Sequence, residues 1–316
     1  MEITPEIKQR LEALNDKYAA LGQDLVSYLD GLLYNDTVKY WDYIELDTLL
    51  SLQKPRTKFP DEQIFIIYHQ ITELYFRLAL REFEQIGNKE GIDEKFFTDR
   101  LGRINRYFEA LILSFDIMVK GMDQGEFMKF RMSLLPASGF QSAQYRFIEI
   151  YSTDFINLVH KDKRSSFKKD SPIAEMYEHI YWKTGATEIN TGKKTLTLIE
   201  FEEKYQDDFI QLSNNCIHKN LWQAYKRLPL ESQQSKSVLD AMKLHDVNVN
   251  INWPLVHYKS AVRYLNIESA DIAATGGTNW QRYLPPRFQR RIFFPDLWTD
   301  QEKEDWGKAW VESALA

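Results

Sequence analysis

The stretch DEQIFIIYHQITELYFRLALREFEQIG, residues 61–87, decides the fold class of this chain. Its apolar side chains recur in steps of three and four from Ile64 to Ile86, which predicts one long amphipathic helix. Asp61 and Glu62 lie in the first turn, and Gly87 is the predicted C-cap. Such a helix needs other helices against which its apolar face can pack.

The same periodicity recurs along most of the chain. It predicts helices over residues 3–34, 45–51, 94–120, 124–135, 138–159, 198–225 and 237–265. The motif Ser138-Gly139-Phe140-Gln141 is a capping box that opens one of them. We expect polar loop insertions near 161–171 and 184–197, and an irregular tail over 274–298. Because no alternating strand–helix pattern is present, the sequence predicts an all-α, bundle-like single domain over residues 1–316.

The composition is that of an ordinary folded protein, with 44% hydrophobic and 27% charged residues among 316. The net charge of −6 gives no indication of a dominant basic surface that would bind nucleic acid. The single cysteine, Cys216, excludes a disulfide framework and Cys-based metal cages. No stretch approaches the ~20 apolar residues that span a bilayer, and no signal pattern opens the chain. We therefore expect a cytoplasmic protein with reduced Cys216 and neither nucleic-acid nor membrane partners.

The spacing of the six histidines disfavours metal sites with several histidine ligands. None pair at spacings of three or four residues, which disfavours two-histidine zinc and di-iron sites, and no glycine-rich nucleotide motif is present. A site that needs one protein ligand per metal remains, and haem is the obvious case. His69 and His257 each lie on an apolar helical face, the latter with Ala261 one turn on. The alternative is that each is a core histidine satisfied by hydrogen bonds.

Two further features have both a chemical and a structural interpretation. Arg131 follows Phe127 on an apolar face. If its guanidinium group is buried, it needs a carboxylate from the protein or from a ligand. The alternative is that its aliphatic stem covers apolar surface while the guanidinium group reaches water. The loop Ala274–Thr278 could close over a ligand, or it could be an ordinary surface loop. The aromatic content of 14% fits either a large helical core or the walls of a site for a flat, apolar ligand.

Together these segments resemble the tryptophan 2,3-dioxygenase family, haem enzymes that open the indole ring of L-tryptophan. The matching pieces run in family order from about residue 40 to residue 298. They are Tyr40-Trp41-Asp42-Tyr43-Ile44, Phe65-Ile66-Ile67-Tyr68-His69-Gln70, Phe130-Arg131, Pro136-Ala137-Ser138-Gly139-Phe140-Gln141-Ser142, Gln144-Tyr145-Arg146, His257 with Arg263, Thr275-Gly276-Gly277 and Phe293-Phe294-Pro295. The runs around Ser138 and His69 are specific, whereas residues 160–245 carry little that matches.

The resemblance implies an all-helical fold that binds haem b and assembles as an intertwined homotetramer. It implies that His257 is the axial ligand of the iron and that His69 hydrogen-bonds the indole N–H on the distal side. It also implies that Arg131 holds the substrate carboxylate. The remaining implied pocket residues are Phe65 near the indole ring, Tyr40 and Tyr43 as walls, Thr275 over the amino-acid end, and Phe127, which stands where the family usually has a tyrosine.

The implied reaction converts L-tryptophan and O₂ to N-formylkynurenine. Two alternatives remain open at this point. One is a haem oxygenase of the same fold that acts on another indole and inserts one oxygen atom. The other is a helical haem sensor or carrier without turnover. Phe127 and the run Gly276-Gly277-Thr278-Asn279-Trp280 both depart from the family at the amino-acid end of the pocket, so they bear on the substrate more than on haem binding.

Overall fold

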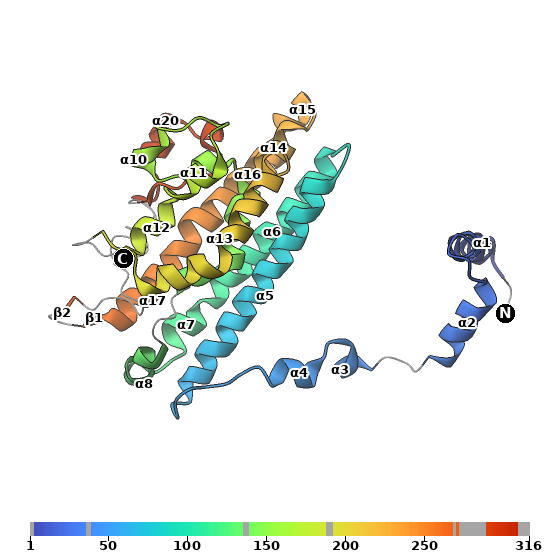
Figure 1. Ribbon diagram of the computed structural model, residues 1–316, viewed down its shortest axis with the longest axis horizontal. Coiled ribbons are helices and arrows are strands. Elements are labelled where there is room, and N and C mark those ends of the chain that lie inside the picture. The colour runs from blue at the N-terminus through green and yellow to red at the C-terminus, as the bar shows by residue number, and fades with distance from the viewer. Residues whose placement is uncertain are drawn as a thin grey trace. The chain divides into compact units, whose positions relative to one another are not determined.

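The computed structural model describes residues 3–35, 39–134, 139–187, 192–267, 270–271 and 289–308. The chain divides into two compact units, unit 1 (Met1–Gln53) and unit 2 (Lys54–Ala316) (Figure 1). Unit 1 contains α1 (Pro5–Ala19), α2 (Leu25–Tyr34), α3 (Tyr40–Tyr43) and α4 (Leu46–Leu50). That residues 1–316 form a single domain stays a prediction.

The single helix predicted over residues 3–34 is wrong. α1 ends at Ala19, and Gly22 adopts a left-handed φ of 70°, which a continuing helix does not allow. Asp24 then caps α2 by accepting a hydrogen bond from the Ser27 amide at 3.0 Å. The apolar periodicity continues through the break, so periodicity alone did not reveal it.

Unit 1 has an unusual surface for a compact unit. None of its described residues is buried. Leu32, Leu33 and Tyr34 are 71–79% exposed, and Trp41 is 52% exposed. A segment of this size with no buried side chain has no core of its own.

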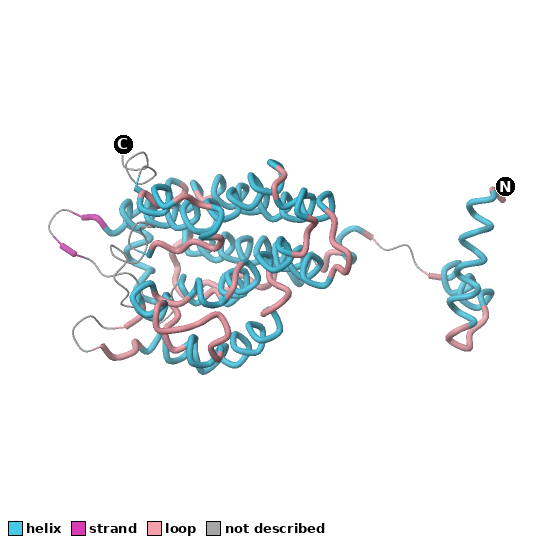
Figure 2. Tube along the Cα trace, turned by 90° about the horizontal axis from the view of Figure 1, so that it is seen from above, coloured by secondary structure: helices cyan, strands magenta, loops and turns pink. Residues whose placement is uncertain are grey.

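Unit 2 is built around α5 (Asp61–Asn88), which confirms the helix predicted over residues 61–87. Figure 1 shows α5 running beside α6, against which α16 packs, and Figure 2 shows from above that the described part of unit 2 is mostly helical. The main packing pairs are α5 with α6 (Glu94–Ser114) and α9 (Ala143–Ser152), α6 with α16 (Lys236–Val247), and α9 with α13 (Leu196–Cys216). The facing sides of these helices bury one contiguous aromatic core that includes Phe76, Phe83, Phe97 and Phe108.

Shorter elements complete unit 2. The further α-helices are α7 (Asp116–Lys120), α8 (Gln124–Phe130), α10 (Lys161–Arg164), α11 (Ile173–Tyr177), α12 (Tyr181–Gly185), α14 (Leu221–Lys226), α15 (Leu230–Gln233), α17 (Trp253–Leu265) and α20 (Asp300–Glu304). The 3₁₀ turns are Arg131–Leu134, Gly139–Gln141, Phe155–Leu158 and Pro295–Leu297, and a π-helical turn spans Asn248–Asn252. The two short strands, β1 (Asn266–Ile267) and β2 (Ala270–Asp271), pair antiparallel. The all-α class is confirmed, and none of the described helices is long and apolar enough to cross a membrane.

Three predicted helices have different bounds in the structure. The helix predicted over 94–120 is two helices that meet at Phe115. The one predicted over 198–225 ends at Cys216, because Asn220 caps α14 by accepting from the Gln223 amide at 2.9 Å. The helix α9 begins after Ser142, which accepts from the Tyr145 amide at 3.3 Å. The predicted capping residue Ser138 lies outside the described residues.

The predicted loops are only partly described. The segment expected to be a loop near 161–171 contains the one-turn helix α10 and is otherwise mostly exposed. Of the segment near 184–197, residues 188–191 lie outside the described residues. The tail predicted over 274–298 is described only from residue 289 onwards.

Gly87 has a different role from the predicted C-cap. The helix α5 continues to Asn88, and Lys89 follows in an extended conformation. A Cβ atom on Gly87 would lie 2.7 Å from the carbonyl oxygen of Lys219. Arg227 donates to the Gly87 carbonyl at 3.5 Å and so satisfies one group at the helix end. Gly87 is therefore required for the close approach of two backbone segments.

Replacing Gly87 with alanine is expected to lower the free energy of unfolding by about 1–3 kcal/mol, because the backbone of Lys219 must shift to make room. Gly102→Ala, inside α6, is the matched control, since its new Cβ would meet only the Arg106 side chain at an ordinary 3.7 Å. That change should raise the free energy of unfolding by up to about 1 kcal/mol. Urea unfolding measures both, and equal effects would contradict the close-approach explanation.

Candidate active site

His69 lies on α5, one turn after Phe65. Its Nδ1 donates to the Phe65 carbonyl oxygen at 2.7 Å, and the centroids of the two rings are 4.1 Å apart. Because a carbonyl oxygen can only accept, Nδ1 carries the proton and Nε2 keeps its lone pair in the neutral ring. The surrounding protein desolvates the ring and lowers its pKa, although part of the side chain stays exposed. His69 is therefore a neutral hydrogen-bond acceptor at pH 7.

His257 lies on α17 and is held in the same way. Its Nδ1 donates to the Trp253 carbonyl oxygen at 2.8 Å. Burial is the main reason that the pKa of His257 falls to about 4, and the nearby His69 lowers it as well. The two histidines that the sequence singled out thus lie on α5 and α17, whose side chains Phe65 and Tyr264 both contact Phe127.

Phe115, which the sequence analysis did not single out, lies beside His257. Its ring centroid is 4.4 Å from that of His257 and 5.4 Å from that of Trp253. Trp253 meets His257 edge-on, also at 4.4 Å between centroids. Phe115 occupies the junction of α6 and α7, a position hidden by the prediction of one uninterrupted helix there.

A second aromatic cluster joins α5, α8 and α17. The ring centroid of Phe127 is 6.3 Å from that of Phe65 and 5.5 Å from that of Phe130. It is also 4.6 Å from the ring of Tyr264. Phe127 therefore contacts both helices that carry the histidines. The cluster presents aromatic faces, which suit a flat, apolar ligand.

Arg131 begins the 3₁₀ turn that follows α8, and only 3% of the residue is exposed. Its Nη1 lies 3.8 Å from the sulfur of Met128. Desolvation lowers the pKa of the guanidinium, yet an arginine keeps its charge at pH 7. The structure thus places this cation in the interior.

Three predicted site residues are not joined to this group by the described structure. Tyr40 and Tyr43 belong to α3 in unit 1, where they are 71% and 79% exposed. Thr275 lies outside the described residues, as does the run from Gly276 to Trp280. The roles of these residues stay predictions.

The described residues offer no metal site with several protein ligands. Nowhere among them do three His, Cys, Asp or Glu side chains gather closely enough to hold an ion. Cys216 is a buried free thiol whose pKa burial raises to about 12, so it is not available as a thiolate ligand. A metal beside the two histidines would depend on single imidazole ligands, as haem iron does.

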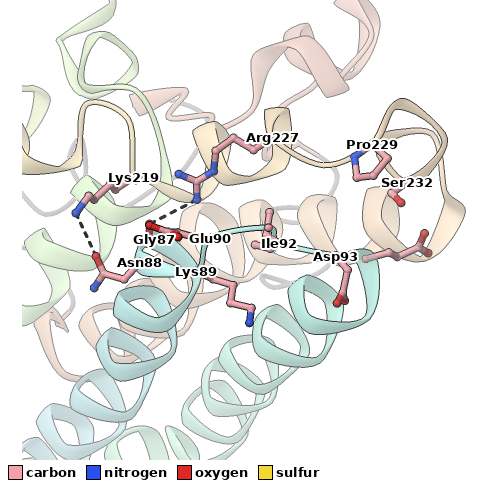
Figure 3. Close-up of a pocket in the computed structure, with 12 residues that line it drawn as sticks. Gly87, Asn88, Lys89, Glu90, Ile92, Asp93, Lys219, Arg227, Pro229 and Ser232 are labelled. Atoms are coloured by element: carbon pink, nitrogen blue, oxygen red, sulfur yellow. Dashed lines mark hydrogen bonds between the residues drawn. The ribbon is translucent and has the colours of Figure 1, made fainter.

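A cavity of about 790 Å³ lies elsewhere, between the α5–α6 connection and the α14–α15 region (Figure 3). Charges of both signs line it, including Lys89, Glu90 and Arg227. Gly87, at its wall, is about 27 Å from His69 at the helical rise of 1.5 Å per residue. We place the chemistry at the histidines, because there the neutral imidazoles, the interior cation and the aromatic walls lie on adjoining elements.

Comparison with known proteins gives the family. The model of a family described as tryptophan 2,3-dioxygenase matches residues 32–206, more than half of the chain. A tryptophan 2,3-dioxygenase of Ruegeria sp. (strain TM1040) is 27% identical over 280 residues, which are 84% of this chain and 92% of the relative. One of Bacillus thuringiensis subsp. konkukian is 27% identical over 285 residues, covering 85% and 94%. One of Bradyrhizobium diazoefficiens is 39% identical over 117 residues, covering 37% and 42%.

The segment matched by the family model carries most of the candidate site. It includes Tyr40, His69 and Arg131, whereas His257 lies beyond it. The relatives of Ruegeria and Bacillus match along almost their whole length, so the similarity is not confined to one motif. The chain therefore belongs to the tryptophan 2,3-dioxygenase family and is an oxidoreductase.

Proposed function

We propose that this protein is a haem-dependent dioxygenase that opens the indole ring of L-tryptophan with O₂ to give N-formylkynurenine. The observation that carries the proposal is the pair of neutral imidazoles, His69 and His257, each locked by its own helix and each packed against an aromatic ring. Membership in the tryptophan 2,3-dioxygenase family supports the substrate. The interior Arg131 supports a ligand that carries a carboxylate.

The residues around His257 fit haem b. The Nε2 atom keeps its lone pair because Nδ1 donates to Trp253, and a pKa of about 4 keeps the ring neutral. Axial ligation of haem iron needs one such nitrogen. Phe115 and Trp253 pack against the imidazole and limit its rotation. Haem b, when bound there, would supply the iron that activates O₂.

The side chains of α5 and the α8 region would bind and orient the substrate. The Nε2 of His69 would accept a hydrogen bond from the indole N–H, and Phe65 would pack against the ring. Arg131 would pair with the carboxylate. A rigid substrate held at both ends keeps its C2–C3 bond in one place, and such positioning supplies much of an enzyme's rate enhancement. His69 would thus orient the indole without being indispensable as a base.

We also propose that the protein assembles as a homotetramer. Unit 1 has no buried described residue, and unit 2 carries an apolar stripe on α5. The stripe consists of Ile67, Ile71, Leu74 and Leu78, which are 38–53% exposed. Monomers rarely leave such contiguous apolar surface in water. Other subunits would cover both surfaces, with Tyr40 and Tyr43 walling the site of a neighbour and Thr275 closing over the amino-acid end.

One observation favours a second candidate substrate class. Phe127 has no hydroxyl group to join Arg131 on a carboxylate, and its neighbours Phe65 and Phe130 are equally apolar. An oxygenase of the same fold acting on an indole without a carboxylate is therefore the second candidate. The substrate tests below separate the two.

His257→Ala is expected to abolish the spectrum of histidine-ligated haem, because it removes the lone pair that would hold the iron. His69→Ala should keep that spectrum and serves as the matched control, since His69 has the same tautomer on another helix. Absorption spectra of the ferrous, haem-supplied variants measure the difference. If both variants keep an unchanged five-coordinate histidine spectrum, the axial assignment is wrong.

Arg131→Ala should lower kcat/KM for L-tryptophan at least about thirtyfold, because loss of one partner of a buried charge pair costs about 2–5 kcal/mol. Phe127→Tyr should tighten tryptophan binding about two- to tenfold by adding one hydrogen bond. Turnover of indole, which has no carboxylate, is the control and should respond to neither change. Intact tryptophan turnover in Arg131→Ala, or a preference of the unmodified protein for carboxylate-free indoles, would support the second candidate instead.

Light scattering at micromolar concentration is expected to give four times the 37.4 kDa mass of one chain. Replacing Leu74 and Leu78 with lysine should reduce that mass, because two charges would have to enter an apolar interface. Leu230→Lys is the control, since Leu230 is 75% exposed on α15 and outside the stripe. A monomer mass for the unmodified protein would contradict the assembly proposal.

A further inference from the structure

The helix that carries His257 departs from α-helical geometry just before that residue. Across the π-helical turn Asn248–Asn252, the Trp253 amide donates to the Asn248 carbonyl, five residues earlier. Pro254 gives the reason, since it has no amide hydrogen and its ring would clash with the Asn250 carbonyl in a regular helix. The turn therefore follows from the sequence at this place.

The π-helical turn determines which face of α17 is turned toward the core. A π-helical turn holds about one residue more than an α-helical turn, and one residue corresponds to about 100° around the axis. α17 thus presents a different face to the core from the one that an uninterrupted continuation of α16 would present. His257 packs against Phe115 only while the turn is kept.

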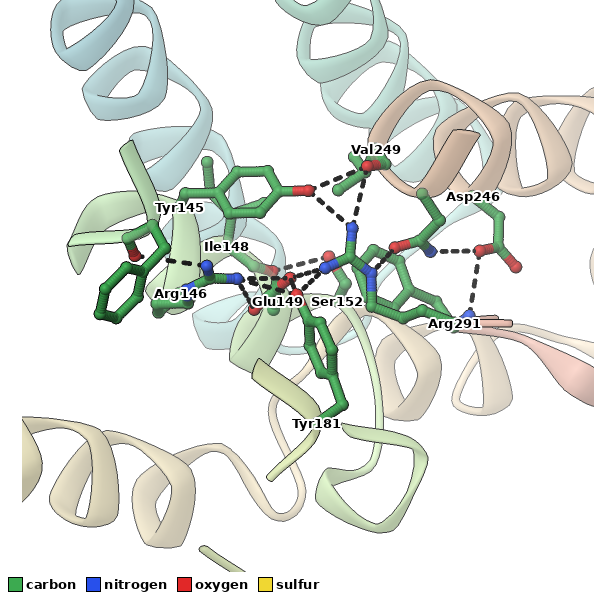
Figure 4. Close-up of polar contacts among 12 residues, drawn as sticks. Tyr145, Arg146, Ile148, Glu149, Ser152, Tyr181, Asp246, Val249 and Arg291 are labelled. Atoms are coloured by element: carbon green, nitrogen blue, oxygen red, sulfur yellow. Dashed lines mark hydrogen bonds and ion pairs between the residues drawn. The ribbon is translucent and has the colours of Figure 1, made fainter. Parts of the chain in front are cut away.

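The turn leaves a buried backbone carbonyl without a helical donor. In an α-helix the Val249 carbonyl would pair with the Trp253 amide, which instead bonds to Asn248. In a π-helix its donor would be residue 254, which is the proline. Two side chains replace the missing donor: the Tyr145 hydroxyl, at 2.9 Å from the Val249 oxygen, and Arg291 Nη2, at 3.2 Å (Figure 4).

Arg291 also holds the side chain of the next residue in the turn. Its Nε donates to Asn250 Oδ1, and the amide of Asn250 donates to Asp246 Oδ1 at 2.6 Å. Asn250 is 2% exposed and Arg291 5%, so both contacts are shielded from water. Arg291 is anchored in turn by Glu149 and Tyr181, and by Tyr145, whose hydroxyl accepts from Nη2 at 2.7 Å.

The C-terminal segment has other anchors besides these contacts. Asp246 already accepts from the Phe293 and Phe294 amides at 3.0 and 3.2 Å, and from Trp298 Nε1 at 2.9 Å. The bonds from Tyr145 and Arg291 to residues 249 and 250 add their restraint at the π-helical turn itself. Their location points to the turn as the element that they stabilise.

We propose that Tyr145 and Arg291 are positioning residues for the haem ligand. By satisfying the Val249 carbonyl and fixing Asn250, they hold the π-helical turn and thereby aim the His257 imidazole at the iron. The inference rests on the proposed function, because it takes His257 as the axial ligand.

The test compares two conservative variants of the full-length, haem-loaded protein. Tyr145→Phe removes a hydroxyl that reaches the turn. Tyr181→Phe is the matched control, because its hydroxyl bonds to the same Arg291 and to Glu149 but not to the turn. The readouts are the rate of haem transfer to apomyoglobin and the iron–histidine stretching frequency of the ferrous protein.

Tyr145→Phe is expected to release haem about two- to tenfold faster, the worth of one hydrogen bond, and to shift the iron–histidine frequency. Arg291→Lys, which keeps the charge but loses the forked contacts, should act in the same direction and release haem about tenfold faster. Tyr181→Phe should leave both readouts unchanged. If Tyr145→Phe does not fold, the haem release rate and the iron–histidine frequency of Arg291→Lys test the inference instead.

Two results would overturn the inference alone. One is an unchanged frequency and release rate in both Tyr145→Phe and Arg291→Lys, and the other is an equal change in Tyr181→Phe, which would indicate general loosening of the network. If the unmodified protein binds haem without an iron–histidine signature, or if His257→Ala keeps it, the proposed function fails and the inference fails with it.

Discussion

The site depends on one repeated interaction, the hydrogen bond from a histidine Nδ1 to the carbonyl oxygen four residues earlier on its own helix. In His69 and His257 this bond fixes the tautomer and the direction of the ring at the same time. Because the acceptor belongs to a helix, each imidazole is held by a regular element and not by a loop. The side-chain contacts that pack α5 and α17 against α6 therefore contribute to the geometry of the site.

The apolar surroundings also select the charge states that the proposed reaction needs. Desolvation by the surrounding protein lowers the pKa of both histidines, which keeps them neutral and leaves each Nε2 free of a proton. The same desolvation penalises the charge of Arg131, which a substrate carboxylate would compensate. In the proposed reaction, one environment would thus serve a metal-binding nitrogen, a hydrogen-bond acceptor and a carboxylate-binding cation. Phe127, unlike a tyrosine, has no hydroxyl group that could join Arg131 on a carboxylate. Binding of the carboxylate would therefore depend on the charge of the guanidinium alone.

Helical periodicity was enough to predict the core face of α5 and to put Arg131 on an apolar face, because it assigns each residue to a side of its helix. It could not reveal Phe115, whose contact with His257 arises from the break between α6 and α7. Nor could it reveal that Gly87 serves a tertiary contact with Lys219, since that partner is distant in the sequence. The π-helical turn before Pro254 could be predicted only in part. The proline signals a departure from the helix, but the side chains that stabilise the departure come from α9 and from residue 291.

Isotope labelling tests the proposed reaction most directly. Ferrous, haem-loaded protein would be mixed with L-tryptophan under ¹⁸O₂ in ordinary water, and the product would be analysed by mass spectrometry before its formyl oxygen exchanges with solvent. We predict N-formylkynurenine with both inserted oxygen atoms labelled, as expected when an oriented indole receives both atoms of one O₂ molecule. A product with one labelled oxygen, or the absence of any ring-opened product, would contradict the assignment as a tryptophan dioxygenase.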